Sequence, residues 1–233
     1  MIKLCLITLF LLASVPSFAA TDSMVQAKDL QNRKALTITD VKIHEIETVE
    51  ALPMFLPTLN PIGDVIMVID SLLALGQKIW PIIEQGRPVV TTKLAPAVSV
   101  IPNIEGTNVV LNQMENWSLP KMVSYRISFN NALDMEVIGF TYTIFYQYNG
   151  TYNSKGRYIT NLKVQASNIY ASWGSNFDAS SELIGISNVG TLQDPLASAI
   201  IQVSYVAKGV FNQNSGARSF YVDGAGNISP IND

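Results

Sequence analysis

Strict alternation of apolar and polar residues over long stretches constrains the fold of this chain most. One stretch places its apolar residues at Val123, Tyr125, Ile127 and Phe129. A second stretch gives one side to Ile138, Phe140, Tyr142, Ile144, Tyr146 and Tyr148. Successive side chains of a β-strand point to opposite faces, so both stretches predict strands with one buried face.

Further strand patterns follow along the chain, separated by short polar turns. They lie at residues 37–49, 89–101, 107–111, 158–173, 183–187, 196–211 and 217–222. A change of parity near Ser167 indicates a β-bulge. About eight strands in succession, with no helical pattern between them, favour an antiparallel β-sandwich or flattened barrel. We therefore expect a mainly β fold, with residues 36–233 as a single domain.

One segment, residues 61–85, has the pattern of an amphipathic helix. Asn60 suits the N-cap position, Pro61 the first helical position, and Gly86 the residue after the C-cap. Its polar residues recur in steps of seven at Asp64, Ser71, Lys78 and Gln85, and at Asp70, Gln77 and Glu84. Seven residues make two helical turns, so these side chains would share one face.

Two interpretations of this helix stay open at the level of sequence. The first docks its apolar side on the sheet. The second makes the protein membrane-active or pore-forming, with Leu72, Leu75, Ile79 and Trp80 as the contacting residues. Membrane contact is the less favoured interpretation, because the polar face carries one Lys against three carboxylates.

The first nineteen residues resemble a secretory signal peptide. A short positive start at Lys3 precedes an apolar run from Leu4 to Ala13, and small residues surround a cleavage position after Ala19. The only cysteine, Cys5, falls inside this segment, so the mature chain contains none. We expect a secreted or periplasmic protein, of bacterial type, with a flexible arm at residues 20–35.

Charge and residue inventory argue against several functions. The chain has 15 Lys and Arg against 18 Asp and Glu, a net charge of −3, and no basic stripe, so nucleic acid is not expected as a partner. Its single histidine, His44, has no partner in any catalytic or zinc-binding motif. We therefore expect no catalytic residues, no metal site and no cofactor. A hydrolase built from facing carboxylates is the second alternative, because glycosidases need only such a pair.

Aromatic residues beside Asn, Gln and Ser are the remaining signal of function. Trp173, Tyr170 and Trp117 are the candidate ligand-binding residues, since flat rings provide contact area at low entropic cost. A glycan or an envelope protein is the partner that such rings suit. The leading expectation is an exported, non-enzymatic β-sandwich that acts as a binding or structural module of the cell envelope or extracellular space.

Overall fold

The structure, a computed structural model, describes residues 18–50, 64–88, 97–104 and 111–231. Its elements are α1 (Phe18–Leu36), β1 (Ile38–Glu50), β2 (Val65–Ile69), β3 (Leu72–Leu75), β4 (Ile79–Glu84), β5 (Arg87–Pro88), β6 (Val98–Pro102), the 3-10 helix η1 (Leu111–Gln113), β7 (Lys121–Asn131), β8 (Glu136–Tyr152), β9 (Lys155–Ala171), β10 (Asn176–Asn188), β11 (Ala197–Lys208), β12 (Gln213–Asp223) and β13 (Ile228–Ile231).

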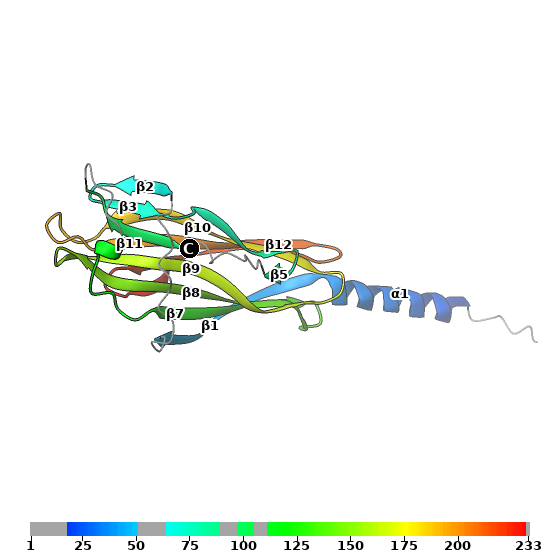
Figure 1. The fold of residues 1–233 in the computed structure, drawn as a ribbon. Helices are drawn as coiled ribbons and strands as arrows, with labels where there is room; N and C mark the ends of the chain where they lie inside the picture. The colour runs from blue at the N-terminus through cyan, green and yellow to red at the C-terminus, as the bar shows by residue number, and fades with distance from the viewer. Residues whose placement is uncertain (1–17, 51–63, 89–96, 105–110, 232–233) are drawn as a thin grey trace, which may run out of the picture.

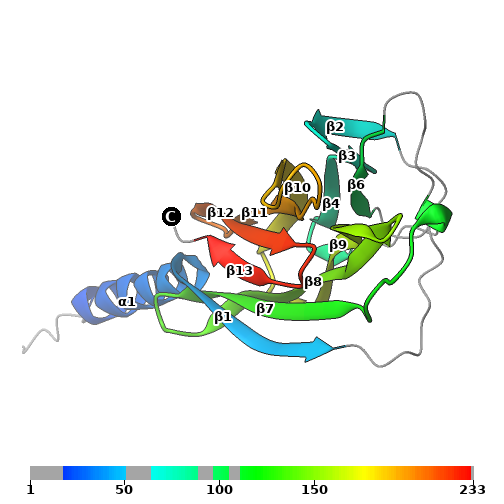
Figure 2. The same cartoon turned by 90° about the vertical axis from the view of Figure 1, so that its left-hand side faces the viewer.

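The strands form two antiparallel sheets that pack as a β-sandwich (Figure 1). The larger sheet has the order β1-β7-β8-β9-β6-β3-β2, and the smaller one has the order β13-β12-β11-β10-β4-β5. In Figure 2 the larger sheet curls from β1 at the bottom to β2 at the top, and the smaller sheet lies inside the curl. The prediction of a mainly β sandwich is confirmed.

The alternating residues of the sequence form the core between the sheets. All four apolar positions of 123–129 are buried, and so are the positions from Ile138 to Tyr146 on the matching face of β8. The ring of Phe220 on β12 lies 4.8 Å from that of Tyr125 and 6.0 Å from that of Tyr142, measured between centroids. Aromatic contacts therefore join the two sheets.

The bulge predicted near Ser167 is present in β9. The ladder between β8 and β9 pairs Gly139 with Tyr170 but Thr141 with Ser167, so β9 holds one extra residue there. This extra residue reverses which face the following side chains occupy. The strand expected at 107–111 and most of 89–96 lie outside the described residues.

The helix predicted for 61–85 is wrong, because the described part of this segment, from residue 64 onward, forms three short strands, and a fourth, β5, follows directly. β2 and β3 pair as a hairpin at one edge of the larger sheet, whereas β4 and β5 belong to the smaller sheet. Leu72, Leu75 and Trp80 are buried in the core, and only Ile79 among the four proposed membrane-contacting residues is exposed. The membrane interpretation that depended on this helix falls with it.

The polar residues of this segment mark turns between strands. Asp70 and Ser71 form the β2–β3 turn, where Asp70 has a φ of 44°. Lys78 lies in the β3–β4 connection and Gln85 in the β4–β5 turn. Each short strand with its turn is about one heptad long, so turn residues reproduce the spacing of a helical face.

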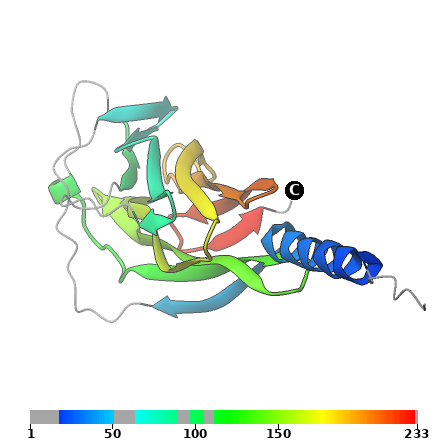
Figure 3. The same cartoon turned by 90° about the vertical axis from the view of Figure 1, so that its right-hand side faces the viewer.

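Residues 20–35, expected as a flexible arm, are helical in the structure, although their sequence carries no helical periodicity. They belong to α1, which extends away from the sandwich (Figures 1 and 3). Alanine, glutamine, lysine and arginine favour helix without any amphipathic pattern, and Asp29 pairs with Arg33 one turn later at 3.4 Å. In the described residues, no helix is long and apolar enough to cross a membrane. The signal peptide stays a prediction, since residues 1–17 are outside the description.

Candidate functional site

Among the residues whose burial the structure describes, three aromatic side chains are exposed, and all three lie at the end of the sandwich from which α1 extends. Trp173 is 86% exposed, Phe211 55% and Tyr170 50%. They come from the β9–β10 connection, the β11–β12 turn and the last residues of β9. The structure therefore places two of the predicted residues, Tyr170 and Trp173, at the same end of the sandwich.

The β7–β8 turn at this end is organised by Asn131. This side chain is buried; its Nδ2 donates to the Ala35 carbonyl at 2.8 Å, and its Oδ1 accepts from the backbone N–H groups of Leu133 and Met135 at 3.0 Å each. The last carbonyls of a helix need partners from outside it, and Asn131 provides one for α1. The exposed Leu133 and Met135 are thereby presented on a fixed turn.

The β11–β12 turn is held by a second asparagine. Asn212 accepts from the backbone N–H of Ile38 at 3.0 Å and donates from Nδ2 to the Ile38 carbonyl at 2.6 Å. The guanidinium carbon of Arg33 on α1 lies 5.7 Å from the centroid of the Phe211 ring. The turn is thus fastened both to the start of β1 and to the helix.

The β9–β10 connection carries Trp173 beside the β11–β12 turn. The backbone N–H of Ser172 donates to the Val137 carbonyl at 2.8 Å, and that of Ser175 donates to the Ser172 carbonyl at 3.0 Å. Gly174 has a φ of 78°, and a Cβ there would approach the side chain of Val210 to 2.8 Å. This close approach brings the Trp173 turn against the neighbouring one.

We call these exposed apolar side chains the apolar rim. Its members are Leu133, Met135, Tyr170, Trp173, Val210 and Phe211. Of these six residues, the sequence indicated only Tyr170 and Trp173. A signal for the others existed: consecutive antiparallel strands place every second turn at the same end of a sheet, and the three turns of the rim are alternate ones.

Charges around the apolar rim are unevenly paired. The carboxylates of Asp40 and Asp134 lie 3.7 and 3.2 Å from the Lys42 ammonium, and Asp29 pairs with Arg33. Hydrogen bonds from Asn130 and Lys42 lower the pKa of Asp134. Three cations at this end form no ion pair within the described part of the chain: Lys28, Lys34 and Lys208.

Trp117, the third predicted ligand-binding residue, lies at the opposite end of the sandwich. The backbone N–H of its neighbour Ser118 donates to the Tyr148 carbonyl at 3.0 Å. The indole is half-buried and covers Gly150, where any Cβ would collide with the ring. Trp117 thus packs against the core and does not join Tyr170 and Trp173.

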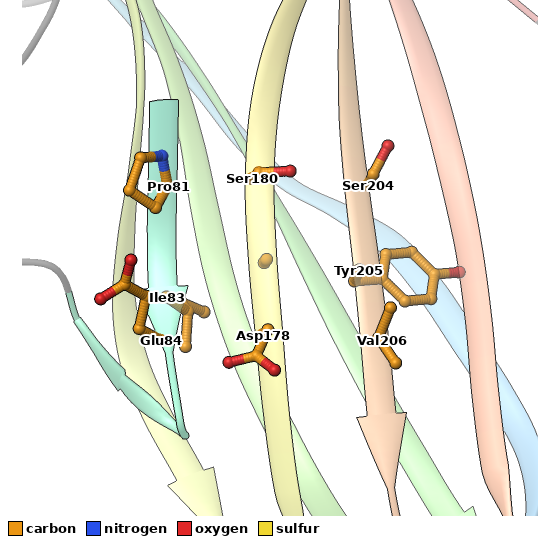
Figure 4. Close-up of a pocket in the computed structure, with 9 residues that line it drawn as sticks. Pro81, Ile83, Glu84, Asp178, Ser180, Ser204, Tyr205 and Val206 are labelled. Carbon is orange, nitrogen blue, oxygen red and sulfur yellow. The ribbon is translucent and has the colours of Figure 1, made fainter. Parts of the chain in front are cut away.

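A groove of ≈ 380 Å³ crosses the smaller sheet at β4, β10 and β11 (Figure 4). It brings the carboxylates of Glu84 and Asp178 to one place, which is the arrangement a carboxylate hydrolase would need. However, Asp178 accepts a hydrogen bond from the backbone N–H of Gln85 at 2.7 Å, and this bond holds the β4–β5 turn. One of the two acids of the groove, Asp178, therefore has a structural role.

Asp223 and Asn227, which flank two glycines, form a hairpin turn. The buried Asp223 carboxylate accepts from the backbone N–H groups of Ala225 and Asn227 at 2.9 and 3.0 Å, and from the Asn227 side chain at 2.8 Å. Within the described ranges, no three residues of the His, Cys, Asp and Glu types gather as a metal site would require.

Comparison with known proteins adds no assignment to this geometry. No protein-family model, no curated protein and no solved structure matches the chain.

Proposed function

We propose that this protein is an exported, non-enzymatic β-sandwich that acts as a binding module in the cell envelope or extracellular space, with the apolar rim as its binding face. The observation that carries the proposal is the position of the exposed rings. Among the residues whose burial the structure describes, every exposed aromatic side chain belongs to the same end of the molecule, namely Tyr170, Trp173 and Phe211.

The way in which the rim is held supports this proposal. Asn131 and Asn212 fix two of its turns through buried or half-buried hydrogen bonds, and backbone hydrogen bonds fix the third. A surface that is already ordered loses less conformational entropy when it binds. Contiguous exposed apolar surface on a soluble domain is typical of an interaction site.

A sedimentation experiment with isolated bacterial cell envelopes tests the proposal. The purified mature chain should pellet with the envelopes. Trp173→Ala and Phe211→Ala should each weaken binding about tenfold, because the loss of either ring removes apolar contact area worth about 1.4 kcal/mol. Leu192→Ala is the matched control, since Leu192 is 73% exposed in the β10–β11 connection at the opposite end.

Two results would contradict the proposal. One is a wild-type chain that stays in the supernatant at every envelope concentration. The other is an equal loss of binding in Leu192→Ala and Trp173→Ala, which would indicate non-specific adsorption of exposed apolar residues.

A further inference from the structure

We infer that the partner of the apolar rim is a lipid bilayer, into whose interfacial layer the rim inserts. This inference rests on the proposed function, because it names the occupant of the same binding face. The membrane contact is made by turns of the β-sandwich, and it involves none of the residues of the 64–88 segment.

The residue types of the rim suit a bilayer surface. Its residues stand on separate turns that project at one end of the sandwich, beside α1 (Figure 1). Tryptophan and tyrosine favour the headgroup level of a membrane, because the ring is apolar and its N–H or O–H is polar. Phe211, Leu133 and Met135 are purely apolar or nearly so, and suit the acyl boundary just beneath.

The charges beside the rim fit anionic headgroups. The whole chain is acidic, with a net charge of −3, yet Lys28, Lys34 and Lys208 at this end have no carboxylate paired with them within the described residues. The acid nearest to Lys28 and Lys34 along the chain, Asp29, is already paired with Arg33. Each lysine near an anionic surface contributes about 1 kcal/mol of attraction.

The course of the chain supports the same orientation. α1 leaves the sandwich at the rim, and the predicted signal peptide precedes α1 in the sequence. A chain still anchored by that segment would hold this end of the sandwich, rather than the opposite end, towards the membrane.

Tryptophan fluorescence gives a direct test, since the three tryptophans differ in exposure. Trp80 is buried, Trp117 is half-buried on Gly150, and Trp173 is exposed. We expect vesicles of phosphatidylcholine mixed with phosphatidylglycerol to shift the emission of the mature chain to shorter wavelength. Trp117→Phe should keep this shift, and Trp173→Phe should abolish it while retaining most of the binding.

Vesicle co-sedimentation measures the binding itself. Trp173→Ala should lower the partition coefficient about tenfold, whereas Leu192→Ala at the opposite end should leave it unchanged. The double variant Lys34→Gln, Lys208→Gln should lose about fivefold per lysine of the preference for phosphatidylglycerol over pure phosphatidylcholine. An unchanged preference in this variant would overturn the role of the lysines.

The outcomes separate the inference from the proposed function. If neither kind of vesicle shifts the fluorescence or pellets the chain, the membrane inference is overturned. If envelopes still bind the chain through Trp173 in that case, the proposed function holds, and the occupant is a protein or glycan. If the envelopes also fail to bind the chain, the membrane inference and the proposed function are both wrong.

Discussion

Asparagine side chains shape the ends of this sandwich at the scale of single residues. The chain has 18 asparagines, as many as all its Asp and Glu together. Asn149, Asn153 and Asn161 adopt positive φ values of 63°, 49° and 54°, a region that asparagine tolerates better than most residues. Asn131 and Asn212 instead cross-link turns to neighbouring backbone. An uncharged amide can donate and accept at once, which suits both uses.

Replacement of Asn131 by Ala should destabilise the protein by about 2–4 kcal/mol. The variant leaves the Ala35 carbonyl and the N–H groups of Leu133 and Met135 without the partner that the buried amide supplies. Urea unfolding of Asn131→Ala and wild type measures the difference. Asn112→Ala, an exposed position in η1, is the control and should stay within about 0.5 kcal/mol of wild type. Equal stabilities for all three proteins would refute the role of Asn131.

At the scale of elements, the segment 64–88 shows how tertiary contacts override a local pattern. Every residue of β3 is buried, and β3 lies within the larger sheet, paired with β2 on one side and β6 on the other. An amphipathic helix would leave half of these residues in water. Valine and isoleucine dominate β2, and such β-branched residues fit a pleated sheet better than a helix.

Gly76→Ala distinguishes the two conformations of this segment. In a helix, replacing Gly by Ala stabilises by about 1 kcal/mol. In the structure Gly76 has a φ of 136°, and a Cβ there would collide with the Ala97 carbonyl, so the substitution should destabilise by more than about 1 kcal/mol. Thermal unfolding, monitored by circular dichroism, shows whether the substitution raises or lowers the stability.

Gly185→Ala is the matched control for that experiment. It lies on β10, and a Cβ at this position meets no atom within 4 Å. The Gly185→Ala variant should therefore have nearly the same stability as wild type. A Gly76→Ala variant more stable than wild type would show that the strand arrangement of 64–88 is incorrect.

At the scale of the whole molecule, the two sheets are joined by aromatic residues whose hydroxyl groups lie inside. Burial raises the pKa of Tyr125 to about 12, with a further increase from the negative charge of Glu45 and an opposing effect of Arg218. Burial likewise raises the pKa values of Tyr142 and Tyr146. The folded sandwich therefore favours the neutral phenols.

Stability should fall as the pH rises from about 10 to about 12. A raised pKa means that the folded state holds the Tyr125 proton more tightly than the unfolded chain, whose tyrosine titrates near 10.0. The stabilisation is complete below pH 10 and is lost as the pH approaches 12. Urea unfolding across this range should show a smaller loss for Tyr125→Phe than for wild type, with exposed Tyr170→Phe as control. A steeper or unchanged loss in Tyr125→Phe would contradict this account.

The candidate site could be predicted from the sequence only in part. Trp173 stands out in an Asn- and Ser-rich turn, so its exposure is a local property that sequence can indicate. Which turns meet at one end decides that Trp173 lies with Phe211 and Leu133. The same arrangement places Trp117 at the other end. That grouping follows from the direction and order of strands distant in the sequence.

What the sequence by itself determined was the strand character of most of the chain, the identity of the buried faces and the sandwich class. These follow from a two-residue period that each strand carries within its own residues. The tertiary structure alone decided the conformation of 64–88 and the composition of the apolar rim. Both depend on backbone partners far along the chain, since β3 pairs with β6 and β4 with β10, and strand hydrogen bonds, unlike those of a helix, come from outside the element.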